Sequence, residues 1–246
     1  MSTLETTTQG EPGADGTVEL TPLSSYDGTL AHRVYASLKD AILSLTYQPG
    51  QMLRKGDICN QLGISRSPVA EAVTRLAAEG LVDVIPQAGT FAARFSMDEI
   101  REGAFLREAL ELAAVERLAA VVSDDQIKVL RRNLRVQKAC IEDLDVQAFY
   151  ALDSEMHRLI LGFTGYRRLA AIAETSWLQV NRARQLILPN QERVEETLRE
   201  HTRIIDALEA RDPDQARHMT QTHLRQLLPN IEAIEQVRPE LFSGRG

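Results

Sequence analysis

A carboxylate and several imidazoles in the C-terminal half have the types and spacing of a metal-binding set. Asp153 and His157 are four residues apart, so both project from the same face of one helix. His201 lies in a later segment among apolar residues, and either His218 or His223 follows near the end of the chain. Three imidazoles and one carboxylate suit a divalent cation, most readily Zn, with Ni, Mn or Fe also compatible.

The residues alone leave several interpretations of this set open. His218 and His223 lie about 140° apart around a helix, so only one of them faces a shared site. A single histidine beside an apolar face is commonly a hydrogen-bonded structural residue, and Asp153 with His157 could form a local pair. A bound metal could also be purely structural in a domain that only dimerises. A metalloenzyme is the remaining alternative, but no separate general base and no Glu-x-x-His pair accompanies the set.

The elements that must position these residues are helices. Apolar residues recur at helical spacing after residue 96, and Ser96–Glu99 and Ser123–Gln126 have the pattern of capping boxes. The sequence therefore predicts an all-α helical bundle over residues 95–240. Six helices are expected, at about 97–121, 124–142, 145–163, 166–187, 191–210 and 213–236.

The preceding segment has a different pattern. Residues 29–94 predict three helices followed by two short β-prone runs around Pro86-Gln87-Ala88-Gly89, which is the order of a winged helix-turn-helix. Residues 1–28 are rich in Thr, Gly, Ser and acids without apolar periodicity, and they predict a disordered acidic tail. The expected fold class is therefore mainly α, with a small wing.

Charge is distributed unevenly along the 246 residues. The net charge is −7, yet residues 30–94 carry seven basic and five acidic residues and are the only positive block. Ser65, Arg66 and Ser67 begin the third helix, where small residues and donors allow the backbone to approach base edges in the major groove. The alternative is an ordinary helix followed by a hairpin, since net +2 is a weak electrostatic signature.

Composition restricts the cellular setting. Two distant cysteines form no CxxC pattern, and no apolar run reaches the roughly 20 residues needed to cross a bilayer. The N-terminus lacks the pattern of a signal peptide. We therefore expect a cytoplasmic protein without a membrane partner.

The N-terminal third contains two continuous motifs, PGQML at 49–53 and QLGISRSPVAEAVTRLAAEGLVDVIPQAGTFAA at 61–93. With these motifs the segment resembles the DNA-binding domain of the GntR family of bacterial transcription regulators. It implies that Ser65, Arg66, Ser67, Pro68, Gly89 and Thr90 contact double-stranded DNA. Ala70 stands where the family often has an arginine, and Arg54, Lys55 and Arg75 are expected to compensate through phosphate contacts.

The C-terminal part contains four motifs in order, LREALELAAVERLAA at 106–120, LDSEMH at 152–157, EHTRIIDAL at 200–208 and ARHMTQTHL at 216–224. With these motifs it is similar to the FCD effector domain of the FadR branch of this family. It implies that Asp153, His157, His201 and His223 are the metal ligands and that His218 is not. The six expected helices favour the VanR-like subgroup.

The resemblance also implies an effector site and an assembly. Arg107 matches an arginine that faces the cavity in relatives, and a guanidinium binds a carboxylate through two hydrogen bonds. We therefore expect a small organic carboxylate at the metal and Arg107, and a homodimer that binds a palindromic operator. The expected function is a ligand-responsive repressor, not an enzyme. The alternative for Arg107 is a pair with Glu111 on a wet helix face.

Overall fold

The computed structural model describes residues 18–187 and 190–244, and the chain divides into two compact units between Ala93 and Arg94. Each unit is described by itself. The order of elements agrees with the predicted fold class, which is mainly α with a small two-stranded sheet.

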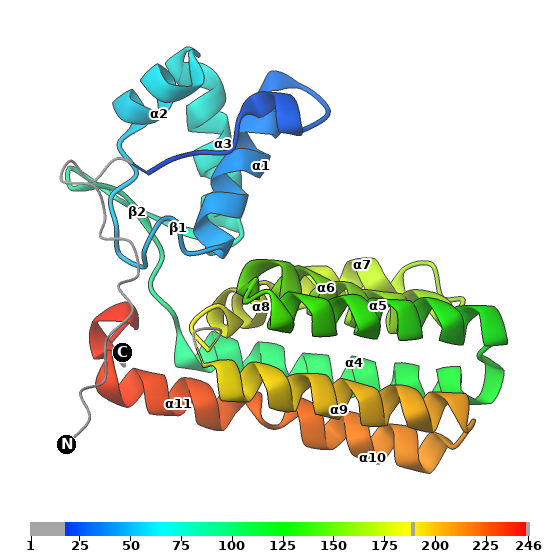
Figure 1. The fold of residues 1–246 in the computed structure, drawn as a ribbon. Coiled ribbons are helices and arrows are strands. Elements are labelled where there is room, and N and C mark those ends of the chain that lie inside the picture. The colour runs from blue at the N-terminus through cyan, green and yellow to red at the C-terminus, as the bar shows by residue number, and fades with distance from the viewer. Residues whose placement is uncertain (1–17, 188–189, 245–246) are drawn as a thin grey trace. The chain divides into compact units, whose positions relative to one another are not determined.

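The first unit is a winged helix-turn-helix (Figure 1). Its elements are a short 3-10 helix at Leu23–Ser25, α1 (Leu30–Leu43), α2 (Lys55–Leu62), α3 (Arg66–Ala78), β1 (Val82–Ile85) and β2 (Gly89–Ala92). The two strands pair antiparallel, with Val82 opposite Ala92 and Ile85 opposite Gly89. Gln87 in the connecting turn has a φ of 61°, and Gly89 has a φ of 136°, a conformation that favours glycine.

Helix α1 packs against α3 to form the core of this unit. Val34, Leu38 and Ile42 recur at intervals of four residues on α1 and are fully buried. Val69 and Leu76 supply the facing side of α3, so the opposite side of α3 remains exposed. The apolar spacing thus fixes which face of α3 is available to a partner.

The predicted tail over residues 1–28 needs a correction. Its first 17 residues lie outside the described residues, but residues 18–28 are not disordered as predicted. Leu20 is buried, and Ser37 Oγ donates a hydrogen bond to the carbonyl oxygen of Thr21 at 2.8 Å. Tyr26 OH also donates a hydrogen bond to Asp40 on α1, so these contacts attach the short segment to α1 although it has no apolar periodicity.

The second unit is an all-α bundle, as predicted (Figure 1). Its helices are α4 (Met97–Val121), α5 (Asp124–Glu142), α6 (Val146–Phe163), α7 (Leu169–Ser176), α8 (Leu178–Arg184), α9 (Gln191–Glu209), α10 (Pro213–Leu224) and α11 (Leu227–Val237). The expected capping box at Ser123 and Gln126 is present. The unit extends past the predicted limit at residue 240, because Leu241 and Phe242 are buried and Ser243 N donates to the Phe95 carbonyl oxygen.

The prediction of six helices is wrong for the described residues, because two of the expected helices are each interrupted. Pro229 lies inside the predicted last helix and has no N–H to donate to the Arg225 carbonyl, so α10 and α11 are separate. The fourth predicted helix, at about 166–187, is interrupted where α7 ends at Ser176. There the hydroxyls of Thr175 and Ser176 donate to carbonyl oxygens one turn earlier. Such bonds compete with regular helix geometry. The VanR-like subgroup therefore stays a prediction without support from the helix count.

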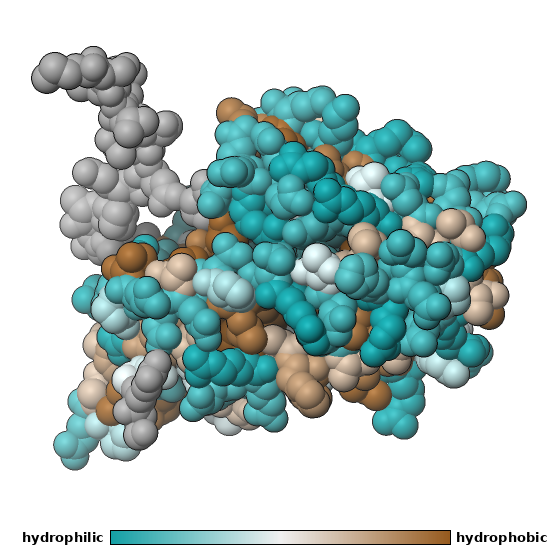
Figure 2. All heavy atoms as spheres, turned by 90° about the horizontal axis from the view of Figure 1, so that it is seen from below, coloured by the Kyte–Doolittle hydropathy of each residue, from teal (hydrophilic) through white to brown (hydrophobic). Residues whose placement is uncertain are grey.

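The core of the bundle lies between α4, α5, α6, α9 and α10. Leu118, Leu130, Met156 and Ile204 are fully buried there. Among the described residues, no helix is both long and apolar enough to span a bilayer. On the face drawn in Figure 2, hydrophilic side chains separate the hydrophobic areas.

Candidate metal centre and DNA-binding surface

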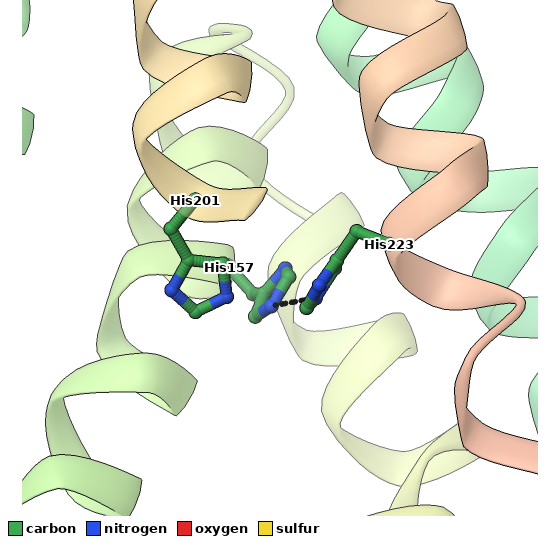
Figure 3. Close-up of side chains that lie close together, drawn as sticks. All are labelled: His157, His201 and His223. Atoms are coloured by element: carbon green, nitrogen blue, oxygen red, sulfur yellow. Dashed lines mark hydrogen bonds between the residues drawn. The ribbon is translucent and has the colours of Figure 1, made fainter. Parts of the chain in front are cut away.

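Three histidines from three different helices meet inside the bundle. His157 lies on α6, His201 on α9 and His223 on α10, and their rings point toward one another (Figure 3). Each ring offers a nitrogen within 4.8 Å of the others, and Nε2 of His157 lies 3.3 Å from Nε2 of His223. All three side chains are buried. Helices spread over 66 residues of sequence therefore supply one cluster. His218, which is exposed on α10, does not belong to it.

The other ring nitrogen of each histidine has a hydrogen-bond acceptor. Nδ1 of His157 lies 2.6 Å from Glu111 Oε2, and Nδ1 of His223 lies 2.7 Å from Glu200 Oε2. Nδ1 of His201 lies 2.9 Å from Gln137 Oε1. Carboxylate and amide oxygens only accept, so in the neutral form of each ring the proton belongs on Nδ1. Nε2 of each ring then carries a lone pair directed to the shared centre.

Asp153 lies one helical turn before His157 and is also buried. Its Oδ1 is 3.3 Å from Nε2 of His201, and neither atom has a well-formed hydrogen bond among the described residues. Its Oδ2 accepts from the guanidinium of Arg184 at the end of α8. The structure therefore brings all four predicted ligands together, with one carboxylate oxygen fixed by an arginine and the other directed to the histidines.

Burial and ion pairing set the protonation of this cluster. Burial lowers the pKa of His223 to about 3 and also lowers the pKa of His157, so both rings are neutral at neutral pH. Burial alone would raise the pKa of Asp153 and of Glu111. The charge of Arg184 holds the pKa of Asp153 well below its usual range, and the hydrogen bonds from His157 and Arg107, together with the charge of Arg107, lower the pKa of Glu111. Neutral imidazoles and ionised carboxylates are the forms that bind metals.

Arg107, the predicted effector residue, forms an ion pair with Glu111, as in the alternative interpretation, but the pair is not on a wet face. Arg107 Nε lies 2.6 Å from Glu111 Oε1, and the two side chains are 4% and 1% exposed. A buried pair between adjacent turns of α4 is positioned by the bundle, because Glu111 also accepts from His157. Arg107 therefore belongs to the same network as the histidines.

A cavity opens beside this network. Its polar lining includes Arg107, Tyr150, Asp153, Arg184, Arg193, Thr197, His223, Gln226 and Asn230, and its apolar lining consists of Phe149, Ile187, Val194, Leu224 and Leu227. It reaches Asp153 and His223, so a molecule held in the cavity would contact the predicted metal ligands directly.

Four residues of this network were missed in the sequence. Glu111 was considered only as a surface partner of Arg107, and Glu200 directly precedes His201 without any spacing that signals its role. Gln137 and Arg184 carry no local signal. Each of the four acts on a residue of a different helix, so only the packing of the bundle reveals it.

The predicted DNA-binding residues of the first unit lie mostly on exposed surface. Ser65, Arg66 and Ser67 are exposed at the start of α3, and Pro68 is half-buried beside them. Ser65 is the N-cap of α3, but its side chain makes no capping hydrogen bond. Its hydroxyl is therefore not used by the helix. Arg54 and Lys55 are exposed at the start of α2, and Gly89 lies at the tip of the wing.

Two predicted DNA contacts are placed differently. Thr90 is 5% exposed and its carbonyl oxygen accepts from Leu53 N, so neither its side chain nor that oxygen is presented to a partner. Strand alternation turns Thr90 inward, which the resemblance did not reveal. The Arg75 guanidinium lies 3.8 Å from the centre of the Tyr35 ring, an interaction that directs it toward α1.

Comparison with known proteins agrees with both units. Residues 30–92 match the family described as bacterial regulatory proteins, gntR family, and residues 102–226 match the FCD domain. An HTH-type transcriptional regulator in an unstable DNA locus of Streptomyces ambofaciens is 33% identical over 210 residues, covering 85% of this chain and 88% of that protein. The chain belongs to the GntR family and carries an FCD domain. It is a DNA-binding transcription regulator, not an enzyme.

Two further relatives fit this GntR-family assignment. The HTH-type transcriptional repressor RspR of Escherichia coli (strain K12) is 29% identical over 211 residues, covering 86% of this chain and 92% of that protein. The crystal structure of a transcriptional regulator GntR from Rhodococcus sp. RHA1 has a TM-score of 0.73 at 23% identity, covering 82% of this chain and 97% of that one. At that identity, the structural likeness concerns the fold alone.

Proposed function

We propose that this GntR regulator is a repressor whose FCD domain binds one divalent metal ion and a small organic carboxylate. The ligands are Asp153, His157, His201 and His223. The observation that carries the proposal is that the three histidines each offer a nitrogen within 4.8 Å of the others, while each Nδ1 has a hydrogen-bond partner elsewhere.

The spacing of the donor atoms supports a metal at this centre. Two lone pairs facing each other at 3.3 Å, on His157 and His223, repel unless a cation lies between them. A tetrahedral zinc ion with Zn–N bonds of about 2.0–2.1 Å keeps two ligand atoms about 3.3 Å apart. His201 Nε2 and Asp153 Oδ1 have the same separation and no other well-formed hydrogen bond among the described residues. Zinc therefore fits best, and Ni, Mn or Fe are compatible with the same donors.

The carboxylate would bind from the cavity that reaches Asp153 and His223. A metal held by four protein ligands accepts a further oxygen ligand when its coordination expands, and the effector carboxylate would supply it. Arg107 lines the same cavity, and a guanidinium has five N–H donors, so its ion pair with Glu111 leaves donors for an anion. The effector would thus contact both the ion and Arg107.

The DNA-binding unit would contact the operator through α3, the start of α2 and the wing. Arg66 with Ser65, Ser67 and Pro68 would meet base edges and phosphates, while Arg54, Lys55 and Gly89 would contact the backbone or the minor groove. A homodimer would place two such units on a palindrome in the cytoplasm. Thr90 is omitted from this surface because it is buried, and Arg75 because it is held on Tyr35.

Thermodynamic linkage between effector binding and DNA binding would explain how the effector releases the regulator from its operator. A carboxylate that binds better to the form of the regulator with low DNA affinity must lower the affinity for DNA. By thermodynamic linkage, bound DNA lowers the affinity for the carboxylate by the same factor. Coupling between two sites in one protein is typically about 5–150-fold. The effector is therefore expected to raise the Kd for the operator by a factor in that range.

A second candidate is a purely structural metal. The near-complete burial of His157 and His201, at 1% and 0% exposed, favours it, because structural sites are closed to solvent. In this case metal would stabilise the bundle and no carboxylate would act.

DNA binding distinguishes the two candidates. An operator is first selected from a random duplex pool with the full chain, and its Kd is measured by fluorescence anisotropy. The protein is used metal-loaded, chelated and reloaded, each with and without a panel of small carboxylates. We expect at least one carboxylate to weaken binding only when metal is present. An unchanged Kd at saturating concentrations of every carboxylate bound by the loaded protein would overturn the proposed mechanism in favour of the structural site.

A further inference from the structure

The residues that line the cavity beside the proposed metal ligands indicate which class of carboxylate it accepts. We infer that the effector is a monocarboxylate with an apolar tail, rather than a di- or tricarboxylate. This inference rests on the proposed metal and carboxylate site, and it follows from how the charges and donors around the cavity are already used.

Each arginine that lines the cavity already has an acidic partner. Arg107 pairs with Glu111, and Arg184 pairs with Asp153. Arg193 lies 2.8 Å and 2.7 Å from the two carboxylate oxygens of Glu200, so its guanidinium is engaged at two nitrogens. The three cations are therefore neutralised by three anions. A divalent ion would be the one positive centre without a matching acid, so a second carboxylate placed away from the ion would meet no cation that lacks an acidic partner among the described lining residues.

The uncharged polar residues of the lining are also engaged. Tyr150 OH donates to the Asn181 carbonyl oxygen, and Thr197 Oγ1 donates to that of Arg193. The side-chain amides of Gln226 and Asn230 each donate to a carbonyl oxygen one turn earlier. The two amides each keep a second N–H, but these donors are uncharged, so a second carboxylate would find no counter-charge among these residues.

The remaining wall of the cavity is apolar. Phe149 and Val194 are 3% and 6% exposed and pack on each other, and Leu224 and Leu227 are 8% and 9% exposed on the facing helices. An ionised group against this wall would lose its hydration without gaining a counter-charge, which is costly. A hydrocarbon tail would instead gain from leaving water.

Binding of defined acids to the metal-loaded full chain tests this inference. The probes are straight-chain monocarboxylates from acetate to octanoate, with succinate and glutarate as dicarboxylates, and Kd is measured by calorimetry while metal content is checked afterwards. Each buried methylene should tighten Kd about fourfold until the cavity is filled. The dicarboxylates should bind at least about tenfold more weakly than monocarboxylates of equal length.

The outcomes separate the inference from the proposed function. Dicarboxylates that bind as tightly as the matched monocarboxylates, or no gain with chain length, would overturn the apolar-tail inference and leave the metal and carboxylate site standing. If no acid of either class binds the loaded protein, the effector part of the proposed function fails and the inference fails with it.

A charge placed in the apolar wall provides the converse test. Leu227→Arg would supply the missing counter-charge, and the preference should shift by about tenfold toward succinate or glutarate. Leu228→Arg is the matched control, because Leu228 is the adjacent leucine and does not line the cavity. If Leu227→Arg does not fold, Asn230→Arg places the charge from a half-buried position in the same lining. A folded cavity variant with unchanged preference would contradict the inference.

Discussion

The two units place their candidate functional residues at opposite extremes of burial. Arg66 and Ser65 are exposed at the start of α3 and contribute little to the core of the first unit. His157 and His201 lie in the interior of the bundle, and each is held by a residue from another helix. Substitution at the DNA surface should therefore change binding without changing stability, whereas substitution at the metal centre should change both.

The largest effect that this comparison predicts is on metal binding. His223→Ala removes one ligand and leaves Glu200 without its histidine partner, so zinc affinity should fall by more than about 100-fold, and the apo bundle should also lose stability. His218→Ala is the matched control on the same helix, because His218 is exposed. Calorimetric zinc titration and thermal denaturation measure both. Equal zinc affinity in the two variants would place the metal elsewhere.

A smaller effect on zinc affinity is expected at the residues that hydrogen-bond to the proposed metal ligands. Gln137→Leu removes the acceptor for His201 Nδ1 and leaves the ring free to change tautomer. The zinc affinity of this variant should fall about 10–100-fold. The zinc affinity of Gln137→Glu, which keeps an acceptor, should fall less. Competition with a zinc-sensitive dye reports these affinities. A Leu variant with the affinity of the natural chain would show that the hydrogen bond does not position His201.

Substitution at the candidate DNA-binding surface should change DNA binding and leave stability and zinc affinity unchanged. Arg66→Ala is expected to weaken operator binding by about 1–3 kcal/mol, with melting temperature and zinc affinity unchanged. Arg203→Ala, an exposed arginine on α9, removes the same charge from the other unit and serves as control. Anisotropy titrations with the selected operator provide the comparison. Loss of thermal stability in the Arg66 variant would contradict the division between binding and folding.

The smallest effect is expected from an ion pair within the first unit. Glu79 accepts from Lys39 and Tyr35. Burial would raise the pKa of Glu79, but these hydrogen bonds outweigh it and lower the pKa. A lowered folded-state pKa gives stability that is present above the unfolded pKa and is lost as the pH falls through the folded one.

Glu79→Gln should therefore destabilise this unit by at most about 1 kcal/mol at pH 7. The difference from the natural chain should vanish toward pH 3. Chemical denaturation across this pH range would check it, and a difference that grows on acidification would reverse the assignment.

The contrast between the two units also explains which features could be predicted from the sequence. The winged unit was predictable almost element by element, because its helices, strands and turn follow one another in a continuous pattern of about 65 residues. The proposed metal ligands, which the structure brings together, could be selected because histidine is rare in this chain and their spacing resembles a family pattern. Arg184 and Gln137 could not be found, since their roles depend on helix rotations that periodicity does not fix. Pro229 was a visible signal for the helix break and was overlooked.

Direct observation of the metal's ligands tests the central claim of a buried three-histidine, one-carboxylate centre. X-ray absorption of the zinc-loaded full chain, with zinc content measured per chain, identifies the coordinating atoms. We predict one zinc per chain, multiple-scattering features of three imidazoles, and nitrogen or oxygen ligands at about 2.0–2.2 Å. A spectrum dominated by sulfur, or one with fewer imidazoles that does not change in His223→Ala, would contradict the account.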